Sequence, residues 1–254
     1  MRLVILTQDE RSVLPEAIDY LLRRLDPDVE VVGAVIFSAS PFGRAESAAV
    51  KAQKVLSIFG LRFALQYSLA AAAQIFFGRG SVKRVFCDHG VEIIDAGKNI
   101  NASQELDVLA TYDADIFLSI TGNQIFKRPL IDLPRLGILN LHTALLPKYR
   151  GLMPTFWVLK NREKETGVSV FWVDEGIDSG PIVVQKRILL SPPISQRALV
   201  KATKILGMEA IIEAVQKIKS GDDSVLRNDD GLSSYFKFPS TQDVREFREN
   251  ASFF

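Results

Sequence analysis

Short apolar runs alternate with longer amphipathic segments along the chain, and this alternation predicts its elements. Runs rich in Val, Ile, Leu and Phe predict strands at 2–7, 30–38, 84–87, 92–95, 114–120, 136–142, 166–173 and 181–189. Apolar positions at helical spacing predict helices at 12–25, 44–78, 102–112, 153–161 and 195–219. Strands that alternate with helices are typical of an α/β fold, in which helices cover both faces of a mostly parallel twisted sheet.

The last two predicted strands are connected differently from the others. Only residues 174–180 join the strand at 166–173 to the strand at 181–189. A link of this length allows a hairpin but not the crossover helix that parallel neighbours need. We therefore expect an antiparallel hairpin at one edge of the sheet.

The predicted elements divide the chain into a large domain and a short C-terminal piece. We expect residues 1–220 to form the domain and residues 221–254 to form an extension that docks on it. The segment Ser240–Asp243 follows the pattern of a capping box and predicts a short terminal helix. Three aromatic residues are expected to dock the extension: Tyr235, Phe236 and Phe238.

The segment Val55–Gly78, within the predicted helical insertion near 44–78, is unusually apolar. Arg62 is its only charged residue, and basic residues flank it. A membrane-spanning helix here would interrupt the sheet, so we favour a helix that packs on its own domain or forms a homodimer. A helix lying on a membrane surface is the remaining alternative. The sequence thus predicts that this segment is helical and covered.

Composition narrows the class of protein. The formal net charge of +1 gives no reason to expect nucleic-acid binding. The single Cys87 excludes an intrachain disulfide and fits a reducing, cytoplasmic compartment. His89 and His142 are the only histidines, which excludes a His-rich metal site, and we expect no metal. The apolar run Leu3–Leu6 is too short for a secretory signal.

Polar residues interrupt one predicted strand near its end. Asn140 and His142 alternate with Leu139 and Leu141, so both polar side chains point to the same face. A Pro- and Gly-containing loop follows, where an open α/β sheet places its ligand crevice. Asp178 lies in the acidic loop of the predicted hairpin. An amide and an imidazole at a strand end indicate a catalytic site, with one oxyanion donor and one proton carrier.

These residues also carry a family resemblance. The Asn140-x-His142 pair, the loop Leu145–Gly151 and the later Asp178 resemble the motifs of 10-formyltetrahydrofolate-dependent formyltransferases. The chain is most similar to enzymes that formylate a nucleotide-linked amino sugar, and similar also to methionyl-tRNA and glycinamide ribonucleotide formyltransferases. Close similarity covers residues 114–190. The resemblance implies a Rossmann-like formyltransferase fold and a cytoplasmic N-formyltransferase that uses 10-formyltetrahydrofolate.

Formyl transfer to an amine gives each of these residues a role. Asn140 would donate to the oxyanion of the tetrahedral intermediate, His142 would carry the proton, and Asp178 would orient the imidazole. By resemblance, two loops would hold the folate: Gln124, Ile125 and Phe126 in one, and Asp174, Glu175, Gly176 and Ile177 in the other. The loop after His142 offers three tentative substrate contacts: Lys148, Tyr149 and Arg150.

The resulting hypothesis is a sugar N-formyltransferase of cell-envelope polysaccharide biosynthesis. Its amine acceptor would be a nucleotide-linked amino sugar. The alternatives are a different small amine, such as a hydroxyornithine or another cell-envelope amine, and a methionyl-tRNA formyltransferase-like protein that lacks the C-terminal barrel. The turn at residues 7–12 contains no glycine, which counts against the phosphate-bearing glycinamide ribonucleotide. A folate- or nucleotide-binding module without activity is disfavoured because all three catalytic residues are present.

Overall fold

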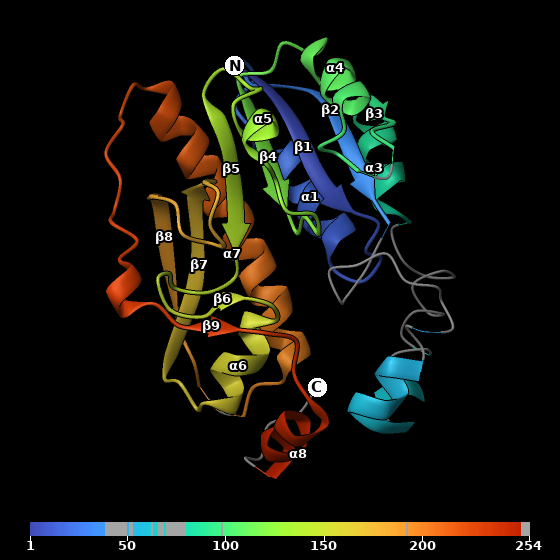
Figure 1. Cartoon of the computed structure of the whole chain (residues 1–254), viewed down its shortest axis with the longest axis vertical. Coiled ribbons are helices and arrows are strands. Elements are labelled where there is room, and N and C mark those ends of the chain that lie inside the picture. The colour runs from blue at the N-terminus through green and yellow to red at the C-terminus, as the bar shows by residue number, and fades with distance from the viewer. Residues whose placement is uncertain are drawn as a thin grey trace.

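The chain folds around a seven-stranded sheet, as a computed structural model shows (Figure 1). The structure describes residues 1–38, 50, 53–61, 63–65, 69, 80–97, 99–191 and 193–249. The strands of the sheet are β1 (Arg2–Gln8), β2 (Glu30–Phe37), β3 (Ile93–Ile94), β4 (Ile116–Ile120), β5 (Gly137–His142), β7 (Glu165–Trp172) and β8 (Ile182–Leu189). Their order is β3-β2-β1-β4-β5-β7-β8.

The sheet is parallel from β3 to β5 and antiparallel at the β8 edge. β1 pairs in parallel with β2 and β4, and β4 pairs in parallel with β5. β7 runs antiparallel to β5, with His142 opposite Ser169, and β8 runs antiparallel to β7. The predicted α/β fold with a mostly parallel sheet and an antiparallel edge hairpin is therefore confirmed. The carboxyl ends of β1, β4 and β5 share one edge of the sheet.

Helices cover both faces of the sheet (Figure 1). Their bounds are α1 (Leu14–Leu22), α3 (Val82–Asp88), α4 (Ser103–Ala110), α5 (Arg128–Ile131), α6 (Pro154–Lys160), α7 (Gln196–Lys219) and α8 (Thr241–Glu249). One core joins α1, α3 and α7 to Leu139 and Leu141 of β5. The other joins α4 and α5 to the opposite face, where Ile138 lies. Since strand side chains alternate, Asn140 and His142 belong to the same face as Ile138.

The predicted strand at 84–87 is wrong, because these residues belong to α3. The hydroxyl of Ser81 caps the helix by accepting from Arg84 N at 3.2 Å. Val82, Val85 and Phe86 are buried, which is the three- and four-residue spacing of a helical face. A short apolar run fits a strand and a buried helical turn equally well. The three- and four-residue spacing of the buried positions, in place of the two-residue spacing of a strand, was the signal that the prediction missed.

A second, two-stranded sheet was not predicted. β6 (Arg150–Gly151) pairs in parallel with β9 (Tyr235–Phe236), so the C-terminal part of the chain lies along the loop that follows β5 (Figure 1). The Phe236 ring stacks at 5.1 Å from the Tyr149 ring and 4.8 Å from the Trp157 ring. Tyr235 remains half exposed, so it docks less than expected. The division at residue 220 stays a prediction.

The predicted terminal helix is confirmed as α8. The backbone N–H and hydroxyl of Ser240 donate to the Asp243 carboxylate at 2.8 and 2.6 Å, and Asp243 N donates back to the Ser240 hydroxyl. This is the reciprocal capping box that the sequence predicts. Phe247 is fully buried and stacks on Phe156 of α6. These contacts fix α8 on the part of the molecule that carries α6.

The described residues of the predicted insertion, 50, 53–61, 63–65 and 69, are helical; its other residues lie outside the described ones. Phe59 is buried, and its ring packs against those of Phe63 and Phe238 at 4.7 and 6.0 Å. Four leucines are exposed in the single chain: Leu56, Leu61, Leu65 and Leu69. Among the described residues no helix is long and apolar enough to cross a membrane. The chain's own domain thus covers only one side of this helix, and cover by a second copy stays a prediction.

We expect the protein to form a dimer through this leucine-bearing side, because burying apolar area contributes about 25 cal/mol per Å². The double variant Leu61→Glu/Leu65→Glu should shift the mass measured by light scattering towards that of a monomer. Leu189→Glu, at a leucine that is 78% exposed on β8, is the matched control and should leave the mass unchanged. A monomeric wild-type protein would contradict the expectation.

Lys204 of α7 gives a second prediction, on stability. The residue is 8% exposed, and burial lowers the pKa of its amine to about 8 from 10.5, although the charge of Glu10 opposes the shift. This difference corresponds to about 3 kcal/mol of destabilisation below pH 8. Between pH 8 and 10.5 the unfolded chain binds more protons than the folded one, so wild-type stability should rise with pH.

Lys204→Met should therefore raise the free energy of unfolding at pH 7, and its advantage over wild type should shrink towards pH 10. Urea unfolding across this range measures both effects. Lys201→Met is the control, since Lys201 is exposed and pairs with Glu16 at 3.3 Å. A constant difference between Lys204→Met and wild type from pH 7 to pH 10 would contradict this account.

Candidate active site

The end of β5 presents two polar side chains on one face of the sheet. His142 is buried and Asn140 is partly exposed, whereas Leu139 and Leu141 pack on the opposite face against the α7 core. The Asn140 side chain makes no hydrogen bond to another described residue. Its amide is therefore available at the carboxyl edge of the sheet, and its role as oxyanion donor stays a prediction.

Both ring nitrogens of His142 face acceptor atoms. Nε2 lies 2.8 Å from the carbonyl oxygen of Tyr149, and because a carbonyl only accepts, Nε2 carries a proton. Nδ1 lies 3.5 Å from Oδ2 of Asp178, which is an ion-pair distance. Nδ1 is thus the nitrogen that can take up or release a proton. The predicted trio of Asn140, His142 and Asp178 is brought together by the fold.

Asp178 is held from its backbone and from its carboxylate. Its φ is 50°, in the left-handed region that few non-glycine residues adopt. Oδ2 accepts from Gly151 N at 2.8 Å, so the loop after His142 also fixes this carboxylate. Gly180, two residues later, lies so close to the carbonyl of Trp172 that any side chain would overlap it. The hairpin loop is therefore tightly constrained on both sides of Asp178.

The predicted folate residues of the hairpin loop have different environments. Oδ1 of Asp174 accepts from Gly176 N at 3.0 Å and from the Ser179 hydroxyl at 2.6 Å, so this carboxylate organises the loop itself. Glu175 is exposed, and the side chain of Ile177 is 49% exposed. The loop thus exposes an apolar and an acidic side chain, and their contact with folate stays a prediction.

The other predicted folate loop follows β4. Gln124 accepts from Ile100 N at 3.1 Å, and Phe126 is buried in the core on this face of the sheet. Ile125 is 74% exposed, while its carbonyl accepts from Asn101 at 2.9 Å. Of the three predicted residues, Ile125 alone presents its side chain to open space, and the other two fix the loop.

The two predicted folate loops are neighbours. The pKa of Arg128, just after the first loop, is raised chiefly by its hydrogen bond with Asp132 and further by the charge of Glu175 in the second loop. A charge can act in this way only over a short distance, since exposed charges are screened beyond about 10 Å. Phe126 of the first loop and Val173, which precedes the second, also pack in the same apolar cluster.

The tentative substrate residues of the 148–150 loop differ in exposure. Lys148 is exposed. Tyr149 is buried, its hydroxyl donates to Glu163 at 2.6 Å, and burial raises its pKa to about 12. Arg150 is buried, and its Nη1 pairs with Asp230 at 2.7 Å. Tyr149 and Arg150 thus have partners within the protein, and contact of all three residues with substrate stays a prediction.

Asn228 was not among the predicted site residues. It is buried, and its side-chain amide donates to the carbonyls of Asp178 and Gly180, each at 2.9 Å. Its Oδ1 accepts from Nη2 of Arg150 at 2.8 Å. No sequence pattern marks an asparagine so distant in the chain as a partner of Asp178. Only the folded structure reveals the contact.

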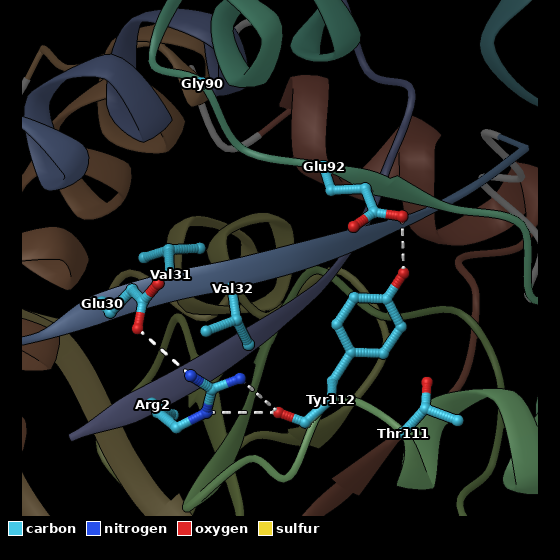
Figure 2. Close-up of a pocket in the computed structure, with 8 residues that line it drawn as sticks. All are labelled: Arg2, Glu30, Val31, Val32, Gly90, Glu92, Thr111 and Tyr112. Atoms are coloured by element: carbon cyan, nitrogen blue, oxygen red, sulfur yellow. Dashed lines mark hydrogen bonds and ion pairs between the residues drawn. The ribbon is translucent and has the colours of Figure 1, made fainter.

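A separate hollow lies at the opposite edge of the sheet, with a volume of about 490 Å³ (Figure 2). Its polar groups bond to one another: Arg2 donates to the Tyr112 carbonyl at 2.9 Å and pairs with Glu30 at 3.3 Å, and the Tyr112 hydroxyl donates to Glu92 at 2.8 Å. Arg2 begins β1, whereas His142 ends β5. The hollow therefore lies at the amino ends of the parallel strands, and His142 lies at their carboxyl ends. We assign no ligand to it.

Comparison with known proteins adds relatives of this chain. A family model described as formyl transferase matches residues 1–215. The methionyl-tRNA formyltransferase of Kosmotoga olearia is 36% identical over 154 residues, which cover 61% of this chain and 49% of that protein. The chain thus spans about half the length of the curated relatives it matches.

Solved structures are similar in fold over most of the chain. Glycinamide ribonucleotide transformylase 1 from Symbiobacterium toebii has a TM-score of 0.61 at 17% identity, covering 87% of this chain and 88% of its own. The N-formyltransferase from Helicobacter canadensis, in complex with folinic acid and dTDP-3-aminofucose, has a TM-score of 0.58 at 18% identity, covering 96% and 72%. The family match over residues 1–215 includes the β5 end and the Asp178 loop, and it shows that the chain belongs to the formyl transferase family.

Proposed function

We propose that this protein transfers a formyl group from 10-formyltetrahydrofolate to the amine of a nucleotide-linked amino sugar. The observation that carries the proposal is the meeting of an amide, an imidazole and a carboxylate at the end of β5, with His142 Nδ1 3.5 Å from Asp178 Oδ2. These are the groups that formyl transfer to an amine requires. Membership of the formyl transferase family supports the same chemistry.

Each of the three residues has a distinct task in this reaction. The Asn140 amide donates a hydrogen bond where negative charge develops on the formyl oxygen. His142 takes the proton from the attacking amine at Nδ1, since Nε2 is already committed to the Tyr149 carbonyl, and passes it to the folate nitrogen that leaves. Asp178 holds the imidazole in this orientation and stabilises its positive charge. When bound, the folate supplies the formyl carbon and the amine that leaves.

The residues beside the β5 end fit a folate co-substrate. A pterin requires apolar walls and polar backbone groups at its edge. Ile125 and Ile177 offer the apolar surface from two neighbouring loops, and Glu175 adds an acidic group. We therefore propose that the 124–126 and 174–177 loops hold the folate. Because one loop follows β4, which pairs with β5, and the other leads directly into Asp178, a folate there would lie beside the catalytic groups.

The start of α1 bears on the identity of the acceptor. Backbone N–H groups at a helix start bind phosphate well, but here the Glu10 carboxylate accepts from Val13 N at 3.3 Å and from Leu14 N at 3.1 Å. The chain's own carboxylate occupies these donors, which counts against a phosphate monoester acceptor at this position. The amino sugar in the similar Helicobacter canadensis protein supports a nucleotide-linked sugar instead.

A second candidate acceptor is methionyl-tRNA. It is favoured by the 36% identity with the methionyl-tRNA formyltransferase of Kosmotoga olearia. The net charge of the chain counts against this acceptor, because 31 basic and 30 acidic residues leave no strong excess of positive charge. RNA binding depends heavily on contacts with phosphates. We therefore rank the tRNA below the sugar.

The decisive experiment measures tetrahydrofolate formation with a panel of acceptors. The panel should contain several nucleotide-linked amino sugars, hydroxyornithine, methionyl-tRNA and glycinamide ribonucleotide. We expect turnover with at least one amino sugar and none with glycinamide ribonucleotide. Turnover confined to methionyl-tRNA would establish the second candidate, and turnover with no amine would contradict formyl transfer.

Changing the proton carrier or its partner should abolish the transfer. We expect His142→Ala and Asp178→Asn to lower kcat by on the order of 10³- to 10⁴-fold, as loss of an oriented base does elsewhere. Folate affinity and the thermal unfolding midpoint should change little. His89→Ala is the matched control, because His89 pairs with Asp19 away from the site. Full activity in either variant would contradict the roles of His142 as proton carrier and Asp178 as its partner.

Replacing the amide donor provides an independent test. Asn140→Asp keeps the shape of the side chain but removes the donor and adds a negative charge. The expected loss in kcat is at least about 10²- to 10³-fold, the effect of removing one oxyanion donor. The exposed Asn99, whose Oδ1 accepts from Asn101 N, keeps that contact when changed to Asp and should retain wild-type kcat. Turnover retained by Asn140→Asp would show that other groups stabilise the oxyanion.

A further inference from the structure

A segment beyond residue 220 reaches the proposed catalytic site through Asn228. The asparagine is 9% exposed, and its amide donates to the carbonyls on either side of the Asp178–Gly180 turn, each at 2.9 Å. Its Oδ1 is fixed in turn by Nη2 of Arg150, at 2.8 Å. Asn228 therefore joins the loop that carries Asp178 to the loop that follows His142.

The backbone of Asp178 needs such a restraint. A left-handed conformation with φ of 50° costs a non-glycine residue about 1–3 kcal/mol and persists only where surrounding contacts impose it. The hydrogen bond to the carbonyl of Asp178 acts on this residue itself, and the one to Gly180 closes the turn behind it. Without them the carboxylate would retain only its bond from Gly151 N as a described polar anchor near His142.

The same segment also fixes the other partner of His142. The Ser234 hydroxyl accepts from Tyr149 N at 2.9 Å, and the Ser234 carbonyl accepts from Arg150 N at 2.8 Å. These bonds hold the peptide whose carbonyl accepts from His142 Nε2. Residues 228–234 thus restrain both groups between which the imidazole lies, although the family match ends at residue 215.

We propose that Asn228 is a positioning residue for the formyl transfer, acting through Asp178. It keeps Oδ2 within ion-pair distance of Nδ1 and so keeps the proton carrier in its working orientation. The inference rests on the proposed function, since it assigns Asn228 a place in that reaction. It differs from a purely structural role, in which loss of Asn228 would lower stability without altering the surroundings of His142.

Two variants of Asn228 and one control separate these possibilities. Asn228→Asp keeps the size and can still pair with Arg150, but it places carboxylate oxygens against the carbonyls of Asp178 and Gly180. Asn228→Ala removes all of the contacts. The control is Asp230→Asn, which weakens the adjoining ion pair with Arg150 at a side chain that is 81% exposed and leaves the Asn228 contacts in place.

The first readout is steady-state kinetics in the full chain. We expect Asn228→Asp and Asn228→Ala to lower kcat by about 100-fold, the effect of a misplacement of about 1 Å. KM for both substrates should stay within about twofold, and Asp230→Asn should match wild type. Wild-type kcat in Asn228→Asp, or an equal loss in Asp230→Asn, would overturn the proposal.

The second readout does not depend on activity. The chain contains two histidines, so the imidazole ¹⁵N signals of His142 and His89 can be followed by NMR in the labelled protein. The His142 signals should move in Asn228→Asp in the same direction as in Asp178→Asn, while those of His89 stay fixed. If the His142 signals do not move, the positioning role of Asn228 is refuted, whether or not the protein turns over an acceptor. If the signals move but the protein has no transfer activity, only the proposed function is refuted.

Discussion

The pairing of His142 with two fixed acceptors is the interaction on which the site depends. The Tyr149 carbonyl holds Nε2 at 2.8 Å, and the Asp178 carboxylate faces Nδ1 at 3.5 Å. A buried imidazole between two acceptors can rotate only by leaving a polar atom unsatisfied, which is costly. The orientation of the ring is therefore set before any ligand binds, and the bonds from Gly151, Asn228 and Ser234 keep these two acceptors in place.

The sheet explains why these groups meet. β5 is the last parallel strand, and β7 beside it runs in the opposite direction. β7 ends with Trp172 opposite Leu139, and the loop between β7 and β8 places Asp178 Oδ2 3.5 Å from His142 Nδ1. The antiparallel edge hairpin thus supplies the loop that places the Asp178 carboxylate beside His142.

Much of the fold could be predicted from the sequence, because local periodicity reports local structure. The strand at 136–142 and the hairpin at 166–189 differ from the observed elements only at their ends. The helical turn at 84–87 was misread because an apolar run of that length has no distinctive period. The pairing of β6 with β9 was missed for another reason, since two-residue strands leave no pattern in the sequence.

The candidate site, too, could be predicted from the sequence only in part. The sequence alone determined the chemical groups: the alternation in Leu139–His142 placed an amide and an imidazole on one face, and the motif spacing pointed to Asp178. The tertiary structure decided how these groups are held: which acceptor each ring nitrogen faces, the left-handed backbone of Asp178, and the bonds from Asn228. Periodicity within a strand is a local property of the chain, whereas a hydrogen bond between residues 50 positions apart depends on how the whole chain packs.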